Sequence, residues 1–506
     1  MREGFIGLDI GTSSVRAVLF DTKGNQKYMS GAEYSMLSKE DGRAEFDPNE
    51  LFDLTVRVIK DCTSNAKSLG MSVEGMGLSC QMHSLMAVDK SGKPLTNVMT
   101  WADVRALEEA DFIKENYDIK ELYKTTGCRI QHPMYPISKI LWLKNNCQDI
   151  FNKSYKFITI KEYIIFRLYG EYVVDHTLAA CQGYFNIRSF RWEGFILEEI
   201  LGIGKEKLSE AVDCLFCFRS MKHEYLKAMG FDTDIPVVIG SGDGIMANLG
   251  SGVVDNEAFS STIGTSGAIR TAVDRPLAAP YQETWCYPFL KDTWVAGGAI
   301  NNGGIVLKWL KNEFLEQFKS DARGYKESIY RLFDRYASQV KPGSDGLIFL
   351  PYLTGERSPD WNAGVRGVMY GLSLNHGRKH IIRAAMEGIL YRLFSIYEVL
   401  AGMNARGSKI IAGGGYAKSE VWLKMQADIF NKDIYITPVN ETSALGAAYL
   451  CMAAVGAVGS LKELLPAMKV QHRIEPDIEV HELYKKVYKN AMEIYNCFYR
   501  DRDPLQ

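Results

Sequence analysis

Two short turns of the same composition lie half a chain apart in this 506-residue sequence. Ile10-Gly11-Thr12-Ser13 recurs as Ile263-Gly264-Thr265-Ser266, and each copy stands between two apolar runs. A glycine followed by two hydroxyl residues leaves backbone N–H groups uncovered and adds O–H donors, a donor set that can cradle a phosphate. A single copy is also typical of an ordinary hairpin turn. Two copies favour a pair of cradles that hold one triphosphate from opposite walls of a cleft.

Charged residues stand on both sides of the first turn. Asp9 comes just before it and Arg16 follows it. A carboxylate at this place can hold Mg²⁺ through water, and a guanidinium can reach phosphate oxygens. The alternative is a local ion pair at the end of a strand.

Asp243 is the candidate acid–base residue, because Gly242 and Gly244 flank it and an apolar run over 235–239 precedes it. The two glycines let a ligand approach the carboxylate closely. Such a group can accept the proton of an attacking hydroxyl during phosphoryl transfer. An aspartate in a glycine-rich turn that caps the following helix is the equally weighted alternative.

Two further polar clusters suit a polyhydroxylated ligand. Gln81 and His83 follow an apolar strand at 76–78, and Asp103 and Arg105 begin a helical stretch behind Trp101, which would form an apolar wall. The alternatives are a satisfied core histidine, an aspartate at a helix N-terminus and a surface arginine.

The sequence also bears on other nucleotide-binding motifs. The chain has no Gly-x-x-x-x-Gly-Lys-Ser/Thr sequence, which excludes a P-loop. Gly413-Gly-Gly415 follows a strand, but Lys418 occupies the place of the third glycine of a dinucleotide fingerprint. A flat glycine floor for adenine or ribose fits better, and a plain turn before a helix is the alternative.

The elements that must position these residues alternate between strand and helix, which predicts an α/β protein. Strands are expected at 4–9 and 15–21, and again at 258–263 and 268–273, around the two turns. Later strands at 409–412 and 433–437 enclose a helix at 418–430. Residues 104–125 and 136–170 read as helix-rich. The uncharged run 442–461 is weakly apolar, so a buried helix is favoured over a membrane span.

The totals restrict the function classes. A chain of 506 residues is expected to form two or more domains. A net charge of −2 gives no overall field for nucleic acid or an anionic membrane. The ten cysteines are scattered, which favours free thiols in a reducing compartment. With no secretory signal after Met1, a cytoplasmic location is expected.

With these motifs in view, the chain resembles the FGGY carbohydrate kinases, members of the actin-like ATPase superfamily, over nearly its whole length. The resemblance rests on both turns, on Met134–Asn146, and on Gly367–Glu387 preceded by Gly355–Trp361. It implies two actin-like (ribonuclease-H-like) α/β domains, residues 1–248 and 249–506, with ATP bound in the cleft between them.

Residue by residue, the resemblance implies the following roles. Asp243 falls at the catalytic base and Asp9 at the Mg²⁺-associated carboxylate. The nucleotide and its phosphates would contact Thr12, Ser13, Arg16, Gly264, Thr265, Gly304, Lys308, Gly414 and Gly415. The glycine run 413–415 is followed by one residue more than in xylulose kinases, so the resemblance leaves open, by one position, which glycine contacts adenine.

The resemblance also bears on the sugar. Gln81-Met82-His83 resembles xylulose kinases, whereas 82–85 with 94–105 and the run 301–304 resemble gluconate kinases. The implied reaction is transfer of the ATP γ-phosphoryl group to the primary hydroxyl of gluconate, with Gln81, His83, Asp103, Arg105 and Asp243 on the sugar. A ketopentose kinase and a non-enzymatic ATP-switch protein are the alternatives. The implied partners are a small sugar and, because family members are often dimers, a second copy of the chain.

Overall fold

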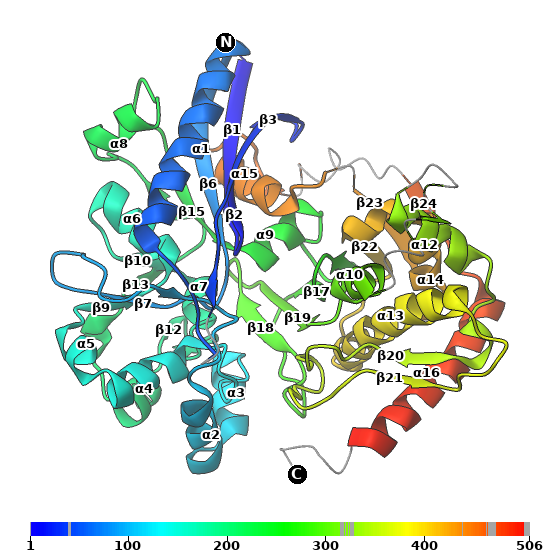
Figure 1. Ribbon diagram of the computed structural model, residues 1–506. Helices are drawn as coiled ribbons and strands as arrows, with labels where there is room; N and C mark the ends of the chain where they lie inside the picture. Colours follow the sequence, from blue (N-terminus) through cyan, green and yellow to red (C-terminus); the bar gives the residue numbers. More distant parts are fainter. Residues whose placement is uncertain are drawn as a thin grey trace.

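The computed structural model describes residues 2–38, 42–313, 318, 320, 321, 323, 328–437, 439–461, 463 and 472–499. Two lobes, each built around one large mixed sheet, make up the molecule (Figure 1). The predicted two-domain α/β fold is confirmed. Within the described residues, no helix is long and apolar enough to cross a membrane.

The two large sheets repeat one arrangement. In each, an antiparallel hairpin, β1–β2 or β16–β17, is extended on one side by parallel strands, β6 and β15 or β22 and β23. An antiparallel strand, β3 or β19, extends it on the other side. The recurring Gly-Thr-Ser turn therefore occupies the same point of both sheets.

The strands of the first sheet, in spatial order, are β14 (Cys217–Phe218), β15 (Val237–Gly242), β6 (Met71–Cys80), β1 (Arg2–Ile10), β2 (Ser14–Asp21) and β3 (Gln26–Glu33). Those of the second are β18 (Trp285–Pro288), β19 (Trp294–Ile300), β17 (Gly267–Val273), β16 (Ala258–Ile263), β22 (Lys409–Gly414), β23 (Asp433–Ile436) and β24 (His472–Ile474). Small sheets join β4 (Leu37–Ser38), β5 (Ala44–Phe46) and β8 (Val98–Met99); β7 (Met86–Val88) and β9 (Lys156–Ile158); β10 (Val173–Asp175) and β13 (Glu210–Val212); β11 (Phe185–Asn186) and β12 (Arg191–Trp192); and β20 (Ile348–Leu350) and β21 (Val368–Tyr370).

Helices pack around both sheets. In the first lobe they are α1 (Pro48–Ser68), α2 (Leu107–Asn116), α3 (Ile119–Thr126), α4 (Pro136–Asn146), α5 (Gln148–Lys153), α6 (Ile160–Tyr169), α7 (His176–Ala180), α8 (His223–Ala228) and α9 (Asp243–Gly250). The later ones are α10 (Gly304–Glu313), α12 (Ile329–Ser338), α13 (Arg378–Gly402), α14 (Glu420–Phe430), α15 (Thr442–Ala454) and α16 (Ile478–Tyr499).

The elements expected around the two turns are found with shifts of a few residues at their ends. The strand expected at 258–263 is β16, and the helix expected at 418–430 is α14 after a short 3₁₀ turn at Gly415–Lys418. The uncharged run contains α15, a buried helix, as predicted.

Helix α15 crosses from the second half of the chain to the first lobe, where it packs on β1, β6 and α9 (Figure 1). Gly7 and Gly77 are direct partners in the β1–β6 pair and form the floor beneath it. A Cβ atom on Gly7 would lie 1.9 Å from the Ala444 carbonyl oxygen, and one on Gly77 would lie 1.9 Å from that of Ala447. The predicted boundary between residues 248 and 249 thus falls inside α9, and residues 442–454 complete the core of the first lobe.

Candidate active site

The two Gly-Thr-Ser turns lie at the boundary of two cavities. Gly264 lines both of them. Thr265 faces the larger cavity, of about 510 Å³, while Thr12 and Ser266 line the smaller one, of about 280 Å³. A phosphate chain that runs from one cavity to the other would therefore pass the second turn, and its end would reach the first.

The larger cavity lies in the second lobe and has the character of a nucleoside site. Gly304, Lys308 and Gly415 line it, beside the apolar faces of Tyr416 and Trp422. Of the two glycines predicted for the adenosine loop, Gly415 lines the cavity. Gly414 is not among the lining residues and serves the bend of the chain, because its φ of +86° favours a residue without a side chain.

Asp243 lines the smaller cavity at the first turn of α9, directly after β15. Its Oδ1 accepts a hydrogen bond from the Gly244 N–H at 2.7 Å. Burial raises the pKa of this carboxyl, and the charge of Arg270 opposes that shift. A carboxylate with a raised pKa is a better proton acceptor than an ordinary surface aspartate.

Asp9 lies near Asp243, at the end of β1, where its register partner is Arg16. Burial, together with the charge of Asp243, raises the pKa of Asp9 to about 7. Two carboxylates held close together in this way fit a divalent cation, which would favour the ionised form of both. Among the described residues no group of three metal-ligating side chains occurs, so a magnesium ion here would be completed by water and phosphate oxygens.

Three residues predicted for phosphate or sugar contact serve the first turn from outside the cavities. Arg16 forms an ion pair with Glu441 at 3.1 Å, at the start of α15. Ser13 is exposed at the tip of the turn. Gln81 donates from Nε2 to the Gly11 carbonyl oxygen at 3.2 Å and so supports the turn's backbone.

Asp103 and Arg105 pair with one another instead of lining the sugar-side cavity. The Arg105 Nε donates to the Asp103 carboxylate at 2.9 Å, and its Nη2 also bonds to Glu45. The guanidinium lies over the Trp142 ring at 5.0 Å. This arginine is already neutralised by two carboxylates, so it offers little to an anionic ligand.

His83 lines the smaller cavity and is held in a strained backbone conformation with φ of 63°. Its Nε2 lies 3.0 Å from the Tyr287 hydroxyl. Burial, with the charges of Lys139 and Arg357, lowers the pKa of His83 well below its ordinary value. The imidazole is therefore neutral at pH 7 and can hydrogen-bond a hydroxyl without adding charge.

Sequence reasoning missed two arginines that line this cavity, Arg270 on β17 and Arg357 in the loop after β20. The Arg357 Nε donates to the Asn301 Oδ1 at 2.7 Å. Arg357 lies in the run Gly355–Trp361, which carried the family resemblance but was given no role. Arg270 lies in β17, a few residues after the second turn. Its place after that turn was the only feature of the sequence that pointed to this residue.

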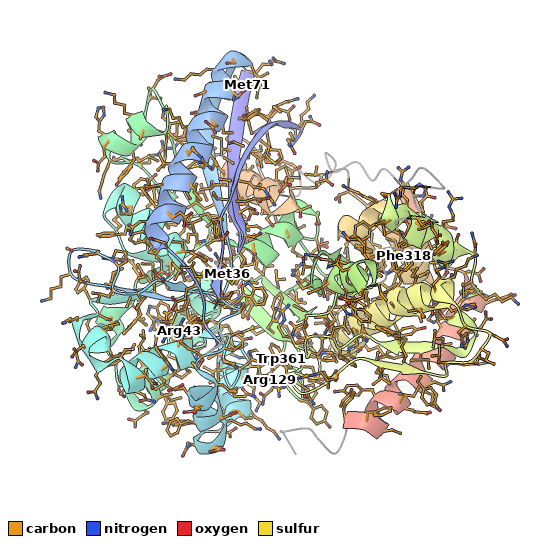
Figure 2. The ribbon with its side chains drawn as sticks, in the orientation of Figure 1. Met36, Arg43, Met71, Arg129, Phe318 and Trp361 are labelled. Carbon is orange, nitrogen blue, oxygen red and sulfur yellow. The ribbon has the colours of Figure 1, made fainter. Side chains whose placement is uncertain are left out.

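Trp361 is one of the residues that line the cavity. Its side chain lies beside Arg129 of the first lobe (Figure 2). The Arg129 guanidinium lies 5.7 Å from the centre of its ring, and the ring of His132 meets it edge-on at 5.3 Å. Side chains of both lobes thus enclose the space in front of Asp243.

Comparison with known proteins gives one consistent result. The N-terminal domain of the FGGY family of carbohydrate kinases matches residues 5–250, and the C-terminal domain of that family matches residues 259–455. The chain is 38% identical to the gluconokinase of Bacillus subtilis (strain 168), over 98% of this chain and 95% of that one. It is 28% identical to a xylulose kinase of Staphylococcus epidermidis, over 100% and 98%.

Solved structures give the same picture. A ligand-bound xylulose kinase from Lactobacillus acidophilus superposes with a TM-score of 0.91 at 34% identity, covering 98% of each chain. A gluconate kinase from the same organism superposes with a TM-score of 0.90 at 34% identity and the same coverage.

Proposed function

The chain belongs to the FGGY family of carbohydrate kinases, and from that premise we propose that it phosphorylates a sugar acid, D-gluconate, at its primary hydroxyl. The donor is ATP, which the kinases of this family use, and the product is 6-phospho-D-gluconate. The relatives at 38% identity that are named gluconokinases support this choice, while xylulose kinases of similar fold keep a ketopentose as the second candidate.

The observation that carries the proposal is the pair of arginines in the lining of the smaller cavity. Two guanidinium groups, those of Arg270 and Arg357, line a space of about 280 Å³ that holds a single carboxylate, Asp243. The Arg270 Nε is buried and has no hydrogen-bond partner among the described residues. A sugar with a carboxylate at one end would form a charge-assisted hydrogen bond with one of these guanidinium groups, which a neutral ketose or glycerol cannot do.

We assign the two arginines to different ends of the substrate. Arg270 lies beside Asp243, where the charge of each group affects the pKa of the other, so it belongs to the reacting end. Arg357 uses Nε and Nη2 for Asn301 and Ile300, which leaves Nη1 without a bond to any described residue. That nitrogen is the one available to the sugar carboxylate, in place of the already paired Arg105.

The reaction then follows from position and charge. Asp243 accepts the proton of the primary hydroxyl as its oxygen attacks the γ-phosphorus, and the bond to the β-phosphate oxygen breaks. The N–H and O–H groups of the turns at Thr12 and Thr265 stabilise the transferring group, and Gly304, Lys308 and Gly415 hold the nucleotide. Magnesium near Asp9, when bound, neutralises phosphate charge. Because the protein does little covalent chemistry, the rate depends on positioning and on keeping water out.

The sugar is tested by a substrate panel with ATP and coupled detection of ADP. We expect the highest kcat/KM with gluconate among gluconate, xylulose, ribulose and glycerol. We also expect Arg357→Gln to raise the KM for gluconate about 10-fold or more, the effect of losing one charge-assisted hydrogen bond. Strong turnover of a ketopentose with none of gluconate would assign the chain to the xylulose kinases.

The base is tested by Asp243→Asn. This variant should lose about 10²- to 10⁴-fold in kcat, the usual contribution of a general base, while its affinity for ADP stays the same. Asp111→Asn, on the exposed face of α2, is the matched control. Wild-type turnover by Asp243→Asn would show that another group accepts the proton.

A further inference from the structure

Trp101 connects the sugar-side cavity with the first phosphate turn. It lines the same cavity as Thr12, and its indole Nε1 donates a hydrogen bond to the Thr12 Oγ1 at 3.0 Å. The two residues come from distant parts of the sequence and meet only in the folded lobe. The direction of this hydrogen bond is fixed, because an indole N–H can donate a hydrogen bond and cannot accept one.

The direction of this bond determines what the threonine hydroxyl can do next. A hydroxyl has one proton and accepts through its lone pairs. Because the Thr12 oxygen accepts from the indole, its own proton points elsewhere, and it donates to no other described residue. A terminal phosphate that extends from the second turn across the boundary of the two cavities would approach Thr12 and offer an acceptor for this proton.

Contacts on both sides hold Trp101 in place. The preceding residue, Thr100, is fixed by its backbone carbonyl, which accepts from the buried Lys139 Nζ at 2.5 Å, and by its hydroxyl, which donates to the Ala44 carbonyl oxygen at 2.9 Å. From the second lobe, the Arg357 guanidinium lies over the indole ring at 5.2 Å. The ring is therefore positioned by groups of both lobes at once.

We propose that Trp101 is a positioning residue for phosphoryl transfer, whose indole N–H orients the Thr12 hydroxyl as a donor to the transferring phosphate. The inference rests on the kinase function proposed above and extends it to a residue that contacts the sugar site. Trp101 acts through Thr12, and its ring also forms a wall of the sugar cavity. The two roles are separable because one uses the N–H group and the other uses the ring face.

A double-mutant cycle separates them. Trp101→Phe keeps an aromatic ring under Arg357 and removes the N–H donor, and Thr12→Val keeps the shape of the side chain and removes the hydroxyl. We expect Trp101→Phe to lower kcat about 3- to 10-fold, the effect of one hydrogen bond, with the sugar KM changed less than about 2-fold. Thr12→Val should lower kcat further, and the double variant should match Thr12→Val alone.

Two controls keep the result interpretable. Trp192→Phe removes an indole hydrogen bond of the same length, 3.0 Å to the Ser209 carbonyl oxygen, and should leave kcat unchanged. Each variant should also bind ADP with wild-type affinity, which shows that the second lobe is intact.

Two outcomes would overturn the inference. In the first, the losses of the two single variants multiply in the double variant. In the second, Trp101→Phe raises the sugar KM and leaves kcat unchanged. The cycle is measured with the sugar that the substrate panel shows to be turned over best. If gluconate is not the substrate, the panel shows it. If Trp101 does not position Thr12, only the double-mutant cycle shows it.

Discussion

Gly77 gives the sharpest test of how the two halves of the chain are joined. Replacing it by alanine places a Cβ atom 1.9 Å from the Ala447 carbonyl oxygen of α15. Real Cβ atoms essentially never approach closer than 3.0 Å, so the helix would have to move by about 1 Å. The backbone of both partners is regular secondary structure, and neither can yield locally.

The cost follows from what α15 buries. Leu445, Leu450 and Met452 are at most 1% exposed, and burying each is worth about 1.5–3 kcal/mol. A gap of up to 1 Å forfeits a quarter to a half of the contact energy. Taking the three side chains together at about 6 kcal/mol, Gly77→Ala should lower the free energy of unfolding by about 1.5–3 kcal/mol.

Urea denaturation followed by circular dichroism measures this loss as a shift of the midpoint. Gly402→Ala is the matched control, because a Cβ at Gly402, the last residue of α13, meets no atom within 4 Å. That variant should be neutral or slightly more stable. If Gly77→Ala unfolded at the same urea concentration as the wild type, the close packing of α15 on the sheet would be refuted.

Three further predictions concern buried charge and the metal. Lys161→Met should lower the free energy of unfolding by about 3–5 kcal/mol, because it removes the only ion-pair partner that the described residues offer to the buried Asp175 carboxylate; both side chains are 0% exposed. Urea denaturation measures this loss, and adding Asp175→Asn should recover part of it. Burial and nearby arginines lower the pKa of His132 to about 3. As the pH falls, the His132 imidazole therefore takes up a proton in the unfolded state before it does so in the folded state. Between pH 6.5 and 5.0 the wild type should thus lose about 1.5 kcal/mol more stability than His132→Asn. Equal losses in thermal scans would contradict this prediction. Asp9→Asn should raise the Mg²⁺ concentration for half-maximal turnover about 10- to 100-fold, and EDTA should stop turnover; an unchanged Mg²⁺ requirement would remove Asp9 from the metal site.

The sequence was most informative where function depends on neighbours along the chain. Each turn and its flanking strands are local, so the pattern around Thr12 and around Thr265 predicted two hairpins, and the structure contains them. The repeat itself predicted two phosphate cradles on opposite walls of a cleft. In the structure, the same turn follows the same strand of each large sheet. Asp243 was identified by its flanking glycines, and the structure places it in a cavity.

Less could be predicted where the partners of a residue are distant in the sequence. Arg105 was expected to be open to a ligand, but Glu45, 60 residues away, pairs with it after folding. Arg270 and Arg357 were overlooked because each acquires its place only when the two lobes enclose a common cavity. The packing of α15 on the first lobe could not be predicted for the same reason. Its amino acids indicate a buried helix but do not indicate which surface covers it.

That packing has a consequence for synthesis of the protein. The strands of the first sheet and helix α9 have left the ribosome by residue 250, but the helix that covers β1 and β6 ends at Ala454. At ordinary translation rates, roughly 200 further residues take about 10–40 s. During this interval the glycine floor at Gly7 and Gly77 lacks its covering helix, so the core of the first lobe is completed only after most of the second half of the chain has been made.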